Sequence, residues 1–509
     1  MTAYLIGVDI GTQGTKAALF DTDINLLATA FEPSRILSPA PGTAWQEADD
    51  LYASCANTIR SLMEQTGVSP SDIAAIGLDG QMAGIMGVDA EGEASTYYDS
   101  WLDMRCGKYM EGMRQTAGRR VTELTGGPVT YTHGPKILWW KHEHPDAYKR
   151  TAKFVLPHVY IVGKMTGTKG RDAYFDYTHL HFSGFGDNAK KEWSDELLCV
   201  FGVEKEKMAR VVSPFEVIGK TTRAFANISG TAEGIPVVAG CGDTAASTFG
   251  SGMFERDLVL DCAGTASVLC SVVNGFVPDT RNETMTMMRS PVDGLWLPLA
   301  YINGGGMCIR WFRDTLSGRP AATYDELEAE AAPLSPGSEG LLFLPHFSGR
   351  VLPNNPDLKG SFLGLDFKHT RGHMYRSVLE SIAYEYKYYL RVLRTLYPGS
   401  DFSRMLSIGG GSNSPLFNAI KADVLGIAVE TFETGETALV GSAVIAGIGA
   451  GALTDYKKPI QGIMKKKNSF APEKSRHAQY APYAEAYLAA LEHVTQFYRS
   501  DPFQLQGID

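Results

Sequence analysis

The sequence predicts a two-domain α/β protein in which one domain is a duplicate of the other. At 509 residues the chain is longer than a single hydrophobic core normally organises. Apolar strands, glycine turns and amphipathic helices alternate along its whole length. The segment LIGVDIGTQGTKAAL at residues 5–19 resembles LVLDCAGTASVLCSV at residues 258–272, and each reads as a strand, a Gly-Thr turn and a returning strand. The two copies lie about half a chain apart, which favours a duplication.

The first half opens with the pattern of a β-meander. Strands are expected over residues 4–8, 17–20 and 26–31. An amphipathic helix is expected over residues 49–66, and Gly67 is a plausible end for it. Short strands follow at residues 73–78 and 85–88. A buried strand over residues 235–239 and a helix over residues 244–249 complete this half.

The domain boundary is expected near residue 247, dividing the chain into residues 1–247 and 248–509. The segment from Gly250 to Gly252 would be a natural hinge. In the second half, the apolar stripe of residues 373–396 predicts a long core helix.

A strand, glycine turn and helix unit comes next in the second half. The strand covers residues 405–408 and the glycines are at 409–411. Ser414 caps the following helix, Pro415 is its first residue and Gly426 lies past its end. Such a unit is suited to binding a nucleotide.

Composition excludes several classes of protein. The net charge is −10 and the basic run at residues 465–467 is short, so neither a nucleic-acid nor a membrane partner is expected. The 7 cysteines have no CxxC spacing, as is typical of reduced thiols. We find no leader pattern and no membrane-spanning apolar run, so we expect a cytoplasmic protein.

The first hairpin turn is a candidate phosphate site. Its glycines would let backbone amides approach phosphate oxygens, its threonines add hydroxyl donors, and the Asp9 carboxylate could hold hydrated Mg²⁺. A strand-end Asp followed by Gly is more often only a turn. The second copy, Gly264 and Thr265, strengthens the phosphate interpretation, because two such hairpins could clamp a polyphosphate from both sides. A repeated structural hairpin without a ligand is the alternative.

Asp243 has two possible roles. It follows a buried strand and begins a helix, so the simpler interpretation is an N-cap. The functional interpretation is a general base that accepts the proton of a substrate hydroxyl during phosphoryl transfer.

Several segments in the same order resemble the FGGY carbohydrate kinases. The most specific is GSFLGLDFKHTRGHMYRSVLE at residues 360–380, and the supporting segments are VVAGCGDTAA, FLPHFSG, SIGGGSNSPLFNAIKADVLG and ETGETALVGSAVIA. The resemblance covers essentially the whole chain and is closest in pattern to xylulokinases. It implies two duplicated ribonuclease H-like domains of the actin/hexokinase/Hsp70 ATPase type. The first domain would bind sugar and carry the base, and the second would bind nucleotide.

The resemblance also implies roles for individual residues, with ATP and Mg²⁺ as cofactors. Asp243 would be the base and Asp9 the carboxylate associated with magnesium. The nucleotide would be bound by Thr12, Gln13, Thr15, Gly264, Thr265, Gly306, Gly410, Gly411, Ser412 and Asn413. The sugar-pocket segments contain Gln81, Met82, Ala83, Trp101, Asp103 and Tyr131, the last shortly before Lys136.

Three positions depart from the xylulokinase pattern. Ala83 stands where that pattern has His, Leu102 where it has Asn, and Thr244 where it has Asn. Because buried donors and acceptors recognise sugar hydroxyls, we expect D-xylulose to be a mediocre substrate unless other residues compensate. His158 and His181 are expected to be surface or structural residues, without a role.

The implied activity is ATP-dependent phosphorylation of a small sugar or polyol, with a pentulose such as xylulose preferred. The alternatives are a kinase for another polyol, ketose or sugar acid, and a non-catalytic actin-like ATPase that acts as a chaperone or filament. The resemblance also makes a homodimer plausible.

Overall fold

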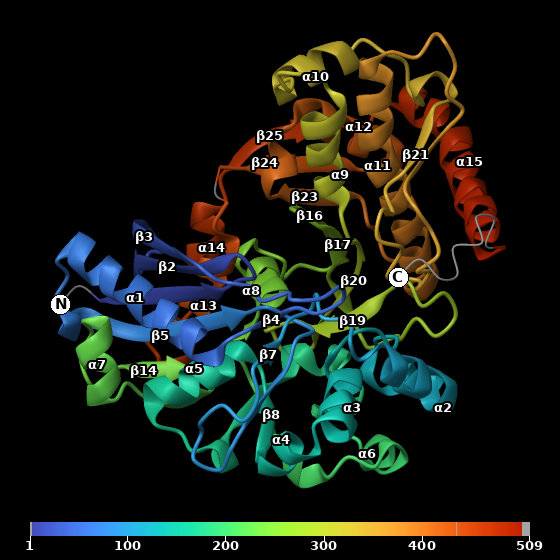
Figure 1. Ribbon diagram of the computed structural model, residues 1–509. Coiled ribbons are helices and arrows are strands. Elements are labelled where there is room, and N and C mark those ends of the chain that lie inside the picture. The colour runs from blue at the N-terminus through green and yellow to red at the C-terminus, as the bar shows by residue number, and fades with distance from the viewer. Residues whose placement is uncertain (1–2, 434, 501–509) are drawn as a thin grey trace.

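The structure, a computed structural model, describes residues 3–433 and 435–500. In these residues the chain forms a seven-stranded and an eight-stranded mixed sheet, each flanked by helices (Figure 1). The first sheet comes from the N-terminal half and the second from the C-terminal half. No helix within the described residues is long and apolar enough to cross a membrane.

The two sheets have the same core topology, which confirms the predicted duplication. In the first, the order is β3-β2-β1-β5-β14-β13, and in the second it is β20-β17-β16-β23-β24-β25. Each begins with an antiparallel meander, continues with parallel strands and ends on an antiparallel edge. The resembling hairpins are β1–β2 and β16–β17, at equivalent places in the two sheets.

The bounds of the strands follow these sheets. The first sheet contains β1 (Tyr4–Ile10), β2 (Gly14–Asp21), β3 (Leu26–Pro33), β5 (Ile73–Gly80), β13 (Val217–Lys220), β14 (Pro236–Val238) and β15 (Cys241–Gly242). The second contains β16 (Leu258–Ala263), β17 (Ser267–Ser271), β18 (Val273–Asn274), β19 (Thr286–Arg289), β20 (Leu295–Ile302), β23 (Arg404–Ile408), β24 (Ala428–Phe432) and β25 (Lys466–Phe470). Small paired strands are β4 (Trp45–Gln46) with β7 (Tyr98–Asp99), β6 (Met86–Val88) with β8 (Lys153–Val155), β9 (Tyr174–Asp176) with β12 (Arg210–Val212), β10 (Gly186–Asp187) with β11 (Glu192–Trp193), and β21 (Leu342–Leu344) with β22 (Ser361–Leu363).

Helices cover both sheets and extend the first domain downward in Figure 1. The first sheet packs against α1 (Ala48–Thr66), α5 (Pro157–Thr166) and α13 (Thr437–Gly449), and α7 (Arg223–Ser229) packs on α1. The second packs against α11 (Arg371–Leu396) and α12 (Pro415–Leu425). The other α-helices are α2 (Gly107–Thr125), α3 (His133–Glu143), α4 (Pro145–Arg150), α6 (Asp195–Phe201), α8 (Asp243–Gly250), α9 (Gly305–Trp311), α10 (Tyr324–Ala331), α14 (Lys457–Ile463) and α15 (Lys474–Arg499).

Capping residues and glycines in the sequence predicted where two helices begin or end. The helix expected over residues 49–66 is α1, and it stops where Gly67 adopts the left-handed conformation with φ of 62°. Ser414 caps α12 by accepting from Phe417 N–H at 3.0 Å, and Gly426 ends it with φ of 70°. These predictions are confirmed because caps depend on adjacent residues only.

Helix α13 lies directly on the backbone of the first sheet, although it comes late in the chain. Gly7 and Gly77 are register partners on β1 and β5. A Cβ at Gly7 would collide with the Leu439 carbonyl oxygen of α13, and one at Gly77 with that of Ser442. The paired glycines therefore form a flat surface on which α13 packs directly against the strand backbones.

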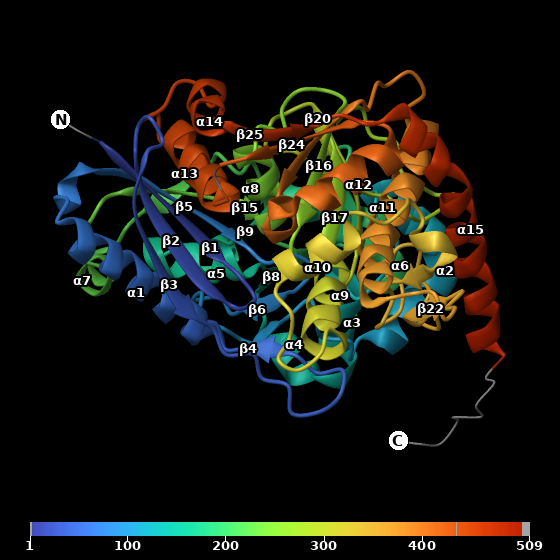
Figure 2. The same ribbon diagram turned by 90° about the horizontal axis from the view of Figure 1, so that it is seen from above.

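Helices α13 and α8 also touch backbone to backbone. A Cβ at Gly250 would collide with the Thr437 carbonyl oxygen, and one at Gly441 with that of Ala246. These two helices share one apolar cluster with Leu5 of the first sheet and Leu260 of the second (Figure 2). Gly250 thus serves close helix packing, and the boundary at residue 247 and the hinge at Gly250–Gly252 stay predictions.

We predict that Gly441→Ala destabilises the protein. The added methyl group must push α8 away from α13, and such overpacking costs about 1–3 kcal/mol. Differential scanning calorimetry should show a lower unfolding temperature. Gly462→Ala in α14 is the matched control, because a Cβ there meets nothing within 4 Å and Ala favours helix. An unchanged unfolding temperature for Gly441→Ala would show that the helices can separate freely.

Candidate active site

Three carboxylates converge at one end of the first sheet. Asp9 on β1 is the register partner of Asp79 on β5, and Asp79 also pairs with Cys241 on β15. Asp243 follows β15 directly as the first residue of α8. The parallel strands thus bring together residues that are far apart in the sequence, including the predicted pair Asp9 and Asp243.

Burial raises the pKa of all three carboxyl groups, and repulsion from neighbouring carboxylates raises it further at Asp9 and Asp79. Burial, with the charge of Asp243 next, raises the pKa of Asp9 to about 7. The pKa of Asp79 is raised well above its usual range by burial and then by Asp9, although Ser442 Oγ donates to Asp79 Oδ2 at 2.6 Å. Burial also raises the pKa of Asp243, and hydrogen bonds from Thr244 oppose the shift. One oxygen of Asp9 and one of Asp79 are buried without a hydrogen-bond partner.

Asp243 does not have the simple capping role. Gly242 is at the N-cap position, and the Asp243 carboxylate accepts only from its neighbour Thr244, through N–H at 2.5 Å and the hydroxyl at 3.1 Å. Thr244 therefore helps to hold the carboxylate in place. Helix α8, which begins at Asp243, shares an apolar cluster with Leu260 of β16. Burial, with smaller contributions that include the charge of Asp243, raises the pKa of Cys262, two residues before Gly264. The carboxylate is therefore near both domains.

The first hairpin turn presents some of its predicted phosphate-binding residues but not all. Gly11 N–H donates to Gly14 O at 3.1 Å and closes the turn, and Gln13 is exposed. Thr15 is fully buried, and its hydroxyl is 2.6 Å from that of Ser54 on α1. The Thr15 side chain thus belongs to the core.

A hydrogen-bond chain joins this turn to two predicted sugar-pocket residues. Trp101 Nε1–H donates to Thr12 Oγ1 at 2.9 Å, and Thr12 Oγ1 donates to Gln81 Oε1 at 3.2 Å. Gln81 Nε2–H continues the chain to Gln46 Oε1 at 2.6 Å. The structure therefore brings Thr12, Gln81 and Trp101 together.

The next turn carries Met82 and Ala83. Met82 packs on Gly242, next to Asp243, where a Cβ would lie 2.6 Å from the Met82 sulfur. Ala83 has a left-handed backbone with φ of 64°, which is uncommon for a residue with a Cβ. Tyr131 lies beside Gly107 at the start of α2, and its place in the sugar pocket stays a prediction.

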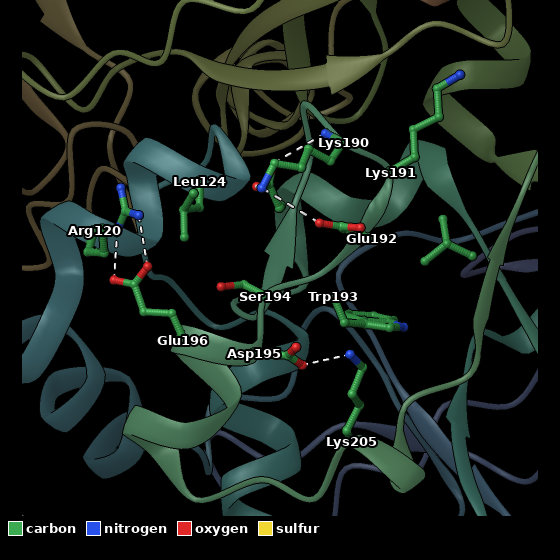
Figure 3. A pocket seen from close by; sticks show the side chains of 12 residues that line it. Arg120, Leu124, Lys190, Lys191, Glu192, Trp193, Ser194, Asp195, Glu196 and Lys205 are labelled. Carbon is green, nitrogen blue, oxygen red and sulfur yellow. Dashed lines mark hydrogen bonds and ion pairs between the residues drawn. The ribbon is translucent and has the colours of Figure 1, made fainter.

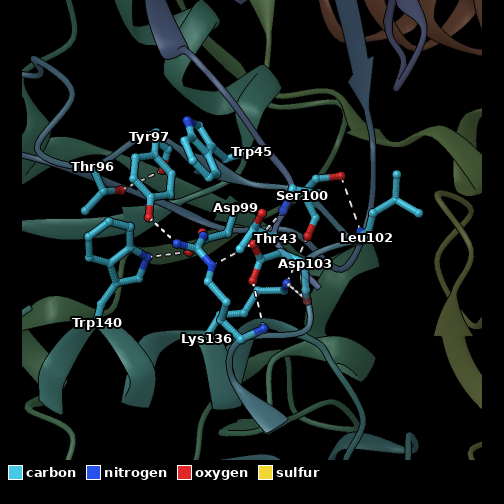
Figure 4. Close-up of polar contacts among 12 residues, drawn as sticks. Thr43, Trp45, Thr96, Tyr97, Asp99, Ser100, Leu102, Asp103, Lys136 and Trp140 are labelled. Atoms are coloured by element: carbon cyan, nitrogen blue, oxygen red, sulfur yellow. Dashed lines mark hydrogen bonds and ion pairs between the residues drawn. The ribbon is translucent and has the colours of Figure 1, made fainter. Parts of the chain in front are cut away.

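Asp103 is committed to an ion-pair cluster that holds the Trp101 loop (Figure 4). Arg105 donates to Asp103 and to Asp99, each at 2.8 Å, and its guanidinium lies 4.3 Å from the centre of the Trp139 ring. Asp103 also accepts from Ala44 N–H at 2.8 Å. Lys136 donates to the carbonyl oxygens of Ser100 and Asp103 at 2.9 and 2.8 Å. Leu102, 39% exposed, points away from this cluster.

Three glycine segments meet at the corresponding end of the second sheet. β16 and β23 run parallel, so Gly264 and Gly409 follow strands that end at the same edge. A Cβ at Gly306 would collide with the Gly264 carbonyl oxygen, and one at Gly411 would lie 2.7 Å from the Ala263 Cβ. Gly410 is exposed and faces open space. The predicted nucleotide residues of this domain, from Gly264 and Thr265 through Gly306 to Ser412 and Asn413, therefore gather in one place.

The histidines of the first domain fit the structural alternative of the prediction. His158 and His181 are buried, and they cluster with His133 and His179. His179 Nδ1 lies 2.8 Å from Asp176 Oδ2, while His158 Nε2 lies 3.2 Å from the same oxygen. Burial lowers the pKa of His158 and of His181, the latter to about 3, so both are neutral near pH 7.

Sequence reasoning missed Asp79, Gln46 and Tyr98. Asp79 stood in the GLDGQMAG segment, where its position at the end of a strand beside Gln81 was a usable signal. Gln46 and Tyr98 gave none, because only the pairing of β4 with β7 brings them to the site.

A separate surface groove of about 460 Å³ contains none of the predicted residues (Figure 3). Its charges neutralise one another: Arg120 pairs with Glu196 at 2.8 Å, and Lys205 with Asp195 at 2.7 Å. The charged side chains of this groove are therefore held in surface ion pairs.

Family models match nearly all of the architecture described above. Residues 4–250 match the FGGY family of carbohydrate kinases, N-terminal domain, and residues 262–450 match its C-terminal domain. The chain belongs to the FGGY family of carbohydrate kinases. Its fold is that of the actin/hexokinase-like ATPases.

Relatives of this FGGY kinase with similar sequence identity to it are named for different substrates. The chain is 25% identical to xylulose kinase of Lactococcus lactis, with 94% of each chain covered, and 25% identical to gluconokinase of Bacillus licheniformis, with 94% of each covered. It is 27% identical to glycerol kinase of Deinococcus radiodurans, covering 88% of this chain and 89% of the relative. The structure of ligand-bound xylulose kinase from Lactobacillus acidophilus has a TM-score of 0.90 at 21% identity and covers 98% of this chain and 99% of that one.

Two buried aspartates should respond oppositely to neutralisation. Asp79→Asn keeps its hydrogen bonds but removes repulsion with Asp9. A raised pKa means that the folded protein binds more protons than the unfolded chain, so these groups lower stability as pH rises from about 4 to about 7. We expect Asp79→Asn to be more stable than wild type by at least about 1 kcal/mol at pH 8 and equally stable near pH 4.

Asp261→Asn is the matched contrast. Asp261 is fully buried in an ion pair with Lys421, so its neutralisation leaves an unpaired buried charge and should cost about 3–5 kcal/mol. Urea unfolding at both pH values measures the two effects. Destabilisation by Asp79→Asn at pH 8 would contradict the repulsion described here.

Proposed function

We propose that this FGGY kinase uses ATP to phosphorylate a hydroxyl group of a small sugar or polyol, with a pentulose as the preferred substrate class. The observation that carries the proposal is the place of Asp243. Asp243 begins α8 directly after β15, at the strand end that carries Asp9 and Asp79, and α8 shares an apolar cluster with Leu260 of β16 in the second sheet. A base in that position can reach a hydroxyl bound by one domain as it attacks a phosphate bound by the other.

Asp243 has the properties of a general base. Among the residues that the structure describes, only Thr244 donates to its carboxylate, so oxygen lone pairs are left to accept a proton. Burial raises its pKa towards neutral, which strengthens it as a base. In the proposed step, the substrate hydroxyl gives its proton to Asp243 while its oxygen bonds to the γ-phosphorus, and the bond from that phosphorus to ADP breaks.

The residues of the second domain fit a nucleotide. The absence of side chains at Gly306 and Gly411 lets their segments pack directly against the Gly264 turn, and Gly410 beside them faces open space, as a backbone site for phosphate oxygens requires. In the proposal, Gly264 and Thr265 hold phosphates together with Thr12, Gln13 and the backbone of Thr15. The adenosine end is assigned to the glycine turn with Ser412 and Asn413 beside α12.

The residues near Asp9 also fit a magnesium ion. Asp9 Oδ1 is buried and has no hydrogen-bond partner, as expected for an oxygen that binds a cation or its water. Among the described residues no three His, Cys, Asp or Glu side chains could enclose a metal ion. This matches magnesium, which protein sites hold by one or two carboxylates together with phosphates and water. Bound there, the ion would neutralise charge on the phosphates.

The sugar side is assigned to Gln81, Met82, Ala83 and Trp101. The Thr12–Gln81–Trp101 chain fixes the polar groups, while Ala83 and the outward-pointing Leu102 offer no donor or acceptor side chain. Asp103, bound by Arg105, is proposed to position the Trp101 loop. The named gluconokinase and glycerol kinase relatives favour a sugar acid or another polyol as the second candidate. The assignment of sugar binding to residues 1–247 and nucleotide binding to residues 248–509, and the homodimer, remain part of the proposal.

A substrate panel tests the proposal. ADP release should require an added sugar, whereas an actin-like chaperone or filament ATPase would release ADP without one. We expect D-xylulose to be phosphorylated, with at least one of D-ribulose, D-gluconate and glycerol giving a higher kcat/KM because Ala83 and Leu102 leave hydroxyls unpaired. Highest kcat/KM for D-xylulose would contradict our interpretation of the pocket. ADP release independent of every sugar would contradict the kinase activity.

We predict that Asp243→Asn lowers kcat with the best substrate by about 100-fold or more, because Asn cannot accept the proton. ATP binding, measured by isothermal titration calorimetry, should be close to wild type. The exposed Asp146→Asn in α4 is the matched control and should keep full activity. Wild-type turnover by Asp243→Asn would exclude Asp243 as the base.

A further inference from the structure

Two directly paired residues near Asp243 each end in a buried polar atom without a partner. Gln46 on β4 is the register partner of Tyr98 on β7. Register partners of an antiparallel pair place their side chains on the same face. Gln46 is 1% exposed and Tyr98 is fully buried, yet Gln46 Nε2 and Tyr98 Oη have no hydrogen-bond partner within residues 3–433 and 435–500.

The orientation of the Gln46 amide follows from its neighbours. The indole of Trp101 can only donate, so it uses an acceptor position of the Thr12 hydroxyl, and that hydroxyl donates to Gln81 Oε1. The Gln81 amide must then donate through Nε2 to Gln46 Oε1. Gln46 therefore directs its –NH₂ group away from the chain, as a donor with nothing to bind.

The Tyr98 phenol packs against the turn at Ala83 and Gly84, where Gly84 has no side chain. A Cβ at Gly84 would collide with Tyr98 Oη, so the hydroxyl lies against the backbone immediately after Ala83. The same turn carries Met82, which packs on Gly242 next to the proposed base, Asp243. Burial, with the charge of Asp243 next, raises the pKa of Tyr98. This hydroxyl can both donate and accept.

Gln46 Nε2 and Tyr98 Oη are hydrogen-bonding groups, which the methyl side chain of Ala83 cannot provide. A buried polar atom without a partner is costly, so its retention beside a catalytic carboxylate points to a ligand that pairs with it. An amide donor and a hydroxyl on one face match two adjacent hydroxyl groups of a sugar.

On the basis of the kinase activity proposed above, we propose that Gln46 and Tyr98 bind adjacent hydroxyl groups of the sugar and determine which sugar is phosphorylated. Gln46 Nε2 donates to one hydroxyl oxygen, and Tyr98 Oη exchanges a hydrogen bond with its neighbour. Because both atoms are covered in the structure, binding requires a side chain of the adjoining turn to move, and the unbranched Met82 is suited to this.

Tyr98→Phe tests the pair, since it removes one oxygen and keeps the ring. We expect kcat/KM for the best of D-xylulose, D-ribulose, D-gluconate and glycerol to fall about 5- to 100-fold, mainly through KM. Tyr384→Phe is the matched control, because Tyr384 also has a buried hydroxyl without a partner but lies on α11 in the second domain. It should leave KM unchanged.

Two further measurements complete the test. Gln46→Glu keeps the acceptor for Gln81, loses the donor, and should also raise KM for the sugar. Monodeoxy analogues of the best sugar each lack one hydroxyl group. Wild type should bind one of these analogues as poorly as Tyr98→Phe binds the parent sugar. Tyr98→Phe should bind that analogue no worse than it binds the parent sugar. The analogue measurement on wild type holds even if a variant fails to fold.

The outcomes separate this pair from the kinase proposal. If wild type phosphorylates none of the four compounds, the proposed function fails. If wild type is active but Tyr98→Phe keeps the KM of wild type for every compound, the pair binds only water and the inference is overturned.

Discussion

The close contact of α13 with the backbones of β1, β5 and α8 is the constraint on which the rest of the structure depends. It requires glycine at four positions far apart in the sequence: Gly7, Gly77, Gly250 and Gly441. With no side chains between them, the helix and the first sheet approach as closely as their backbones allow. Because α8 and α13 also share an apolar cluster with the second sheet, this contact fixes both domains to one core. The position of Asp243, the first residue of α8, follows from it.

The same contact reaches the carboxylates. Ser442 of α13 donates to Asp79, which lies beside Asp9. A residue from late in the chain therefore partly stabilises a group whose burial and like-charged neighbours disfavour ionisation. The repulsion among the carboxylates weakens the fold at neutral pH, but it concentrates negative charge where a cation would bind. Active sites typically keep such charge arrangements although they lower the stability of the fold.

Sequence patterns predicted the features that depend on neighbouring residues. The meander, the end of α1 at Gly67 and the cap of α12 at Ser414 follow from turn and cap chemistry. The duplication was visible because both hairpins retain their glycines. Packing between distant segments was not visible: α13 follows the predicted boundary and yet covers the first sheet, and Thr15 turns its hydroxyl to Ser54 in the core. Gln46 and Tyr98 meet only through the pairing of β4 with β7.

The two ends of the site are built from different parts of the chain. On the proposed nucleotide side, backbone segments meet at Gly306 and Gly411, where a Cβ would collide with the Gly264 carbonyl oxygen or the Ala263 Cβ, so the shape there tolerates little change. On the sugar side, a chain of side-chain hydrogen bonds runs from Trp101 to Gln46, and each link can be replaced without moving the backbone. Under the proposed assignment, substitution is therefore easier on the sugar side than on the nucleotide side. Relatives named for xylulose, gluconate and glycerol at nearly equal identity to this chain are consistent with a site in which the sugar side varies.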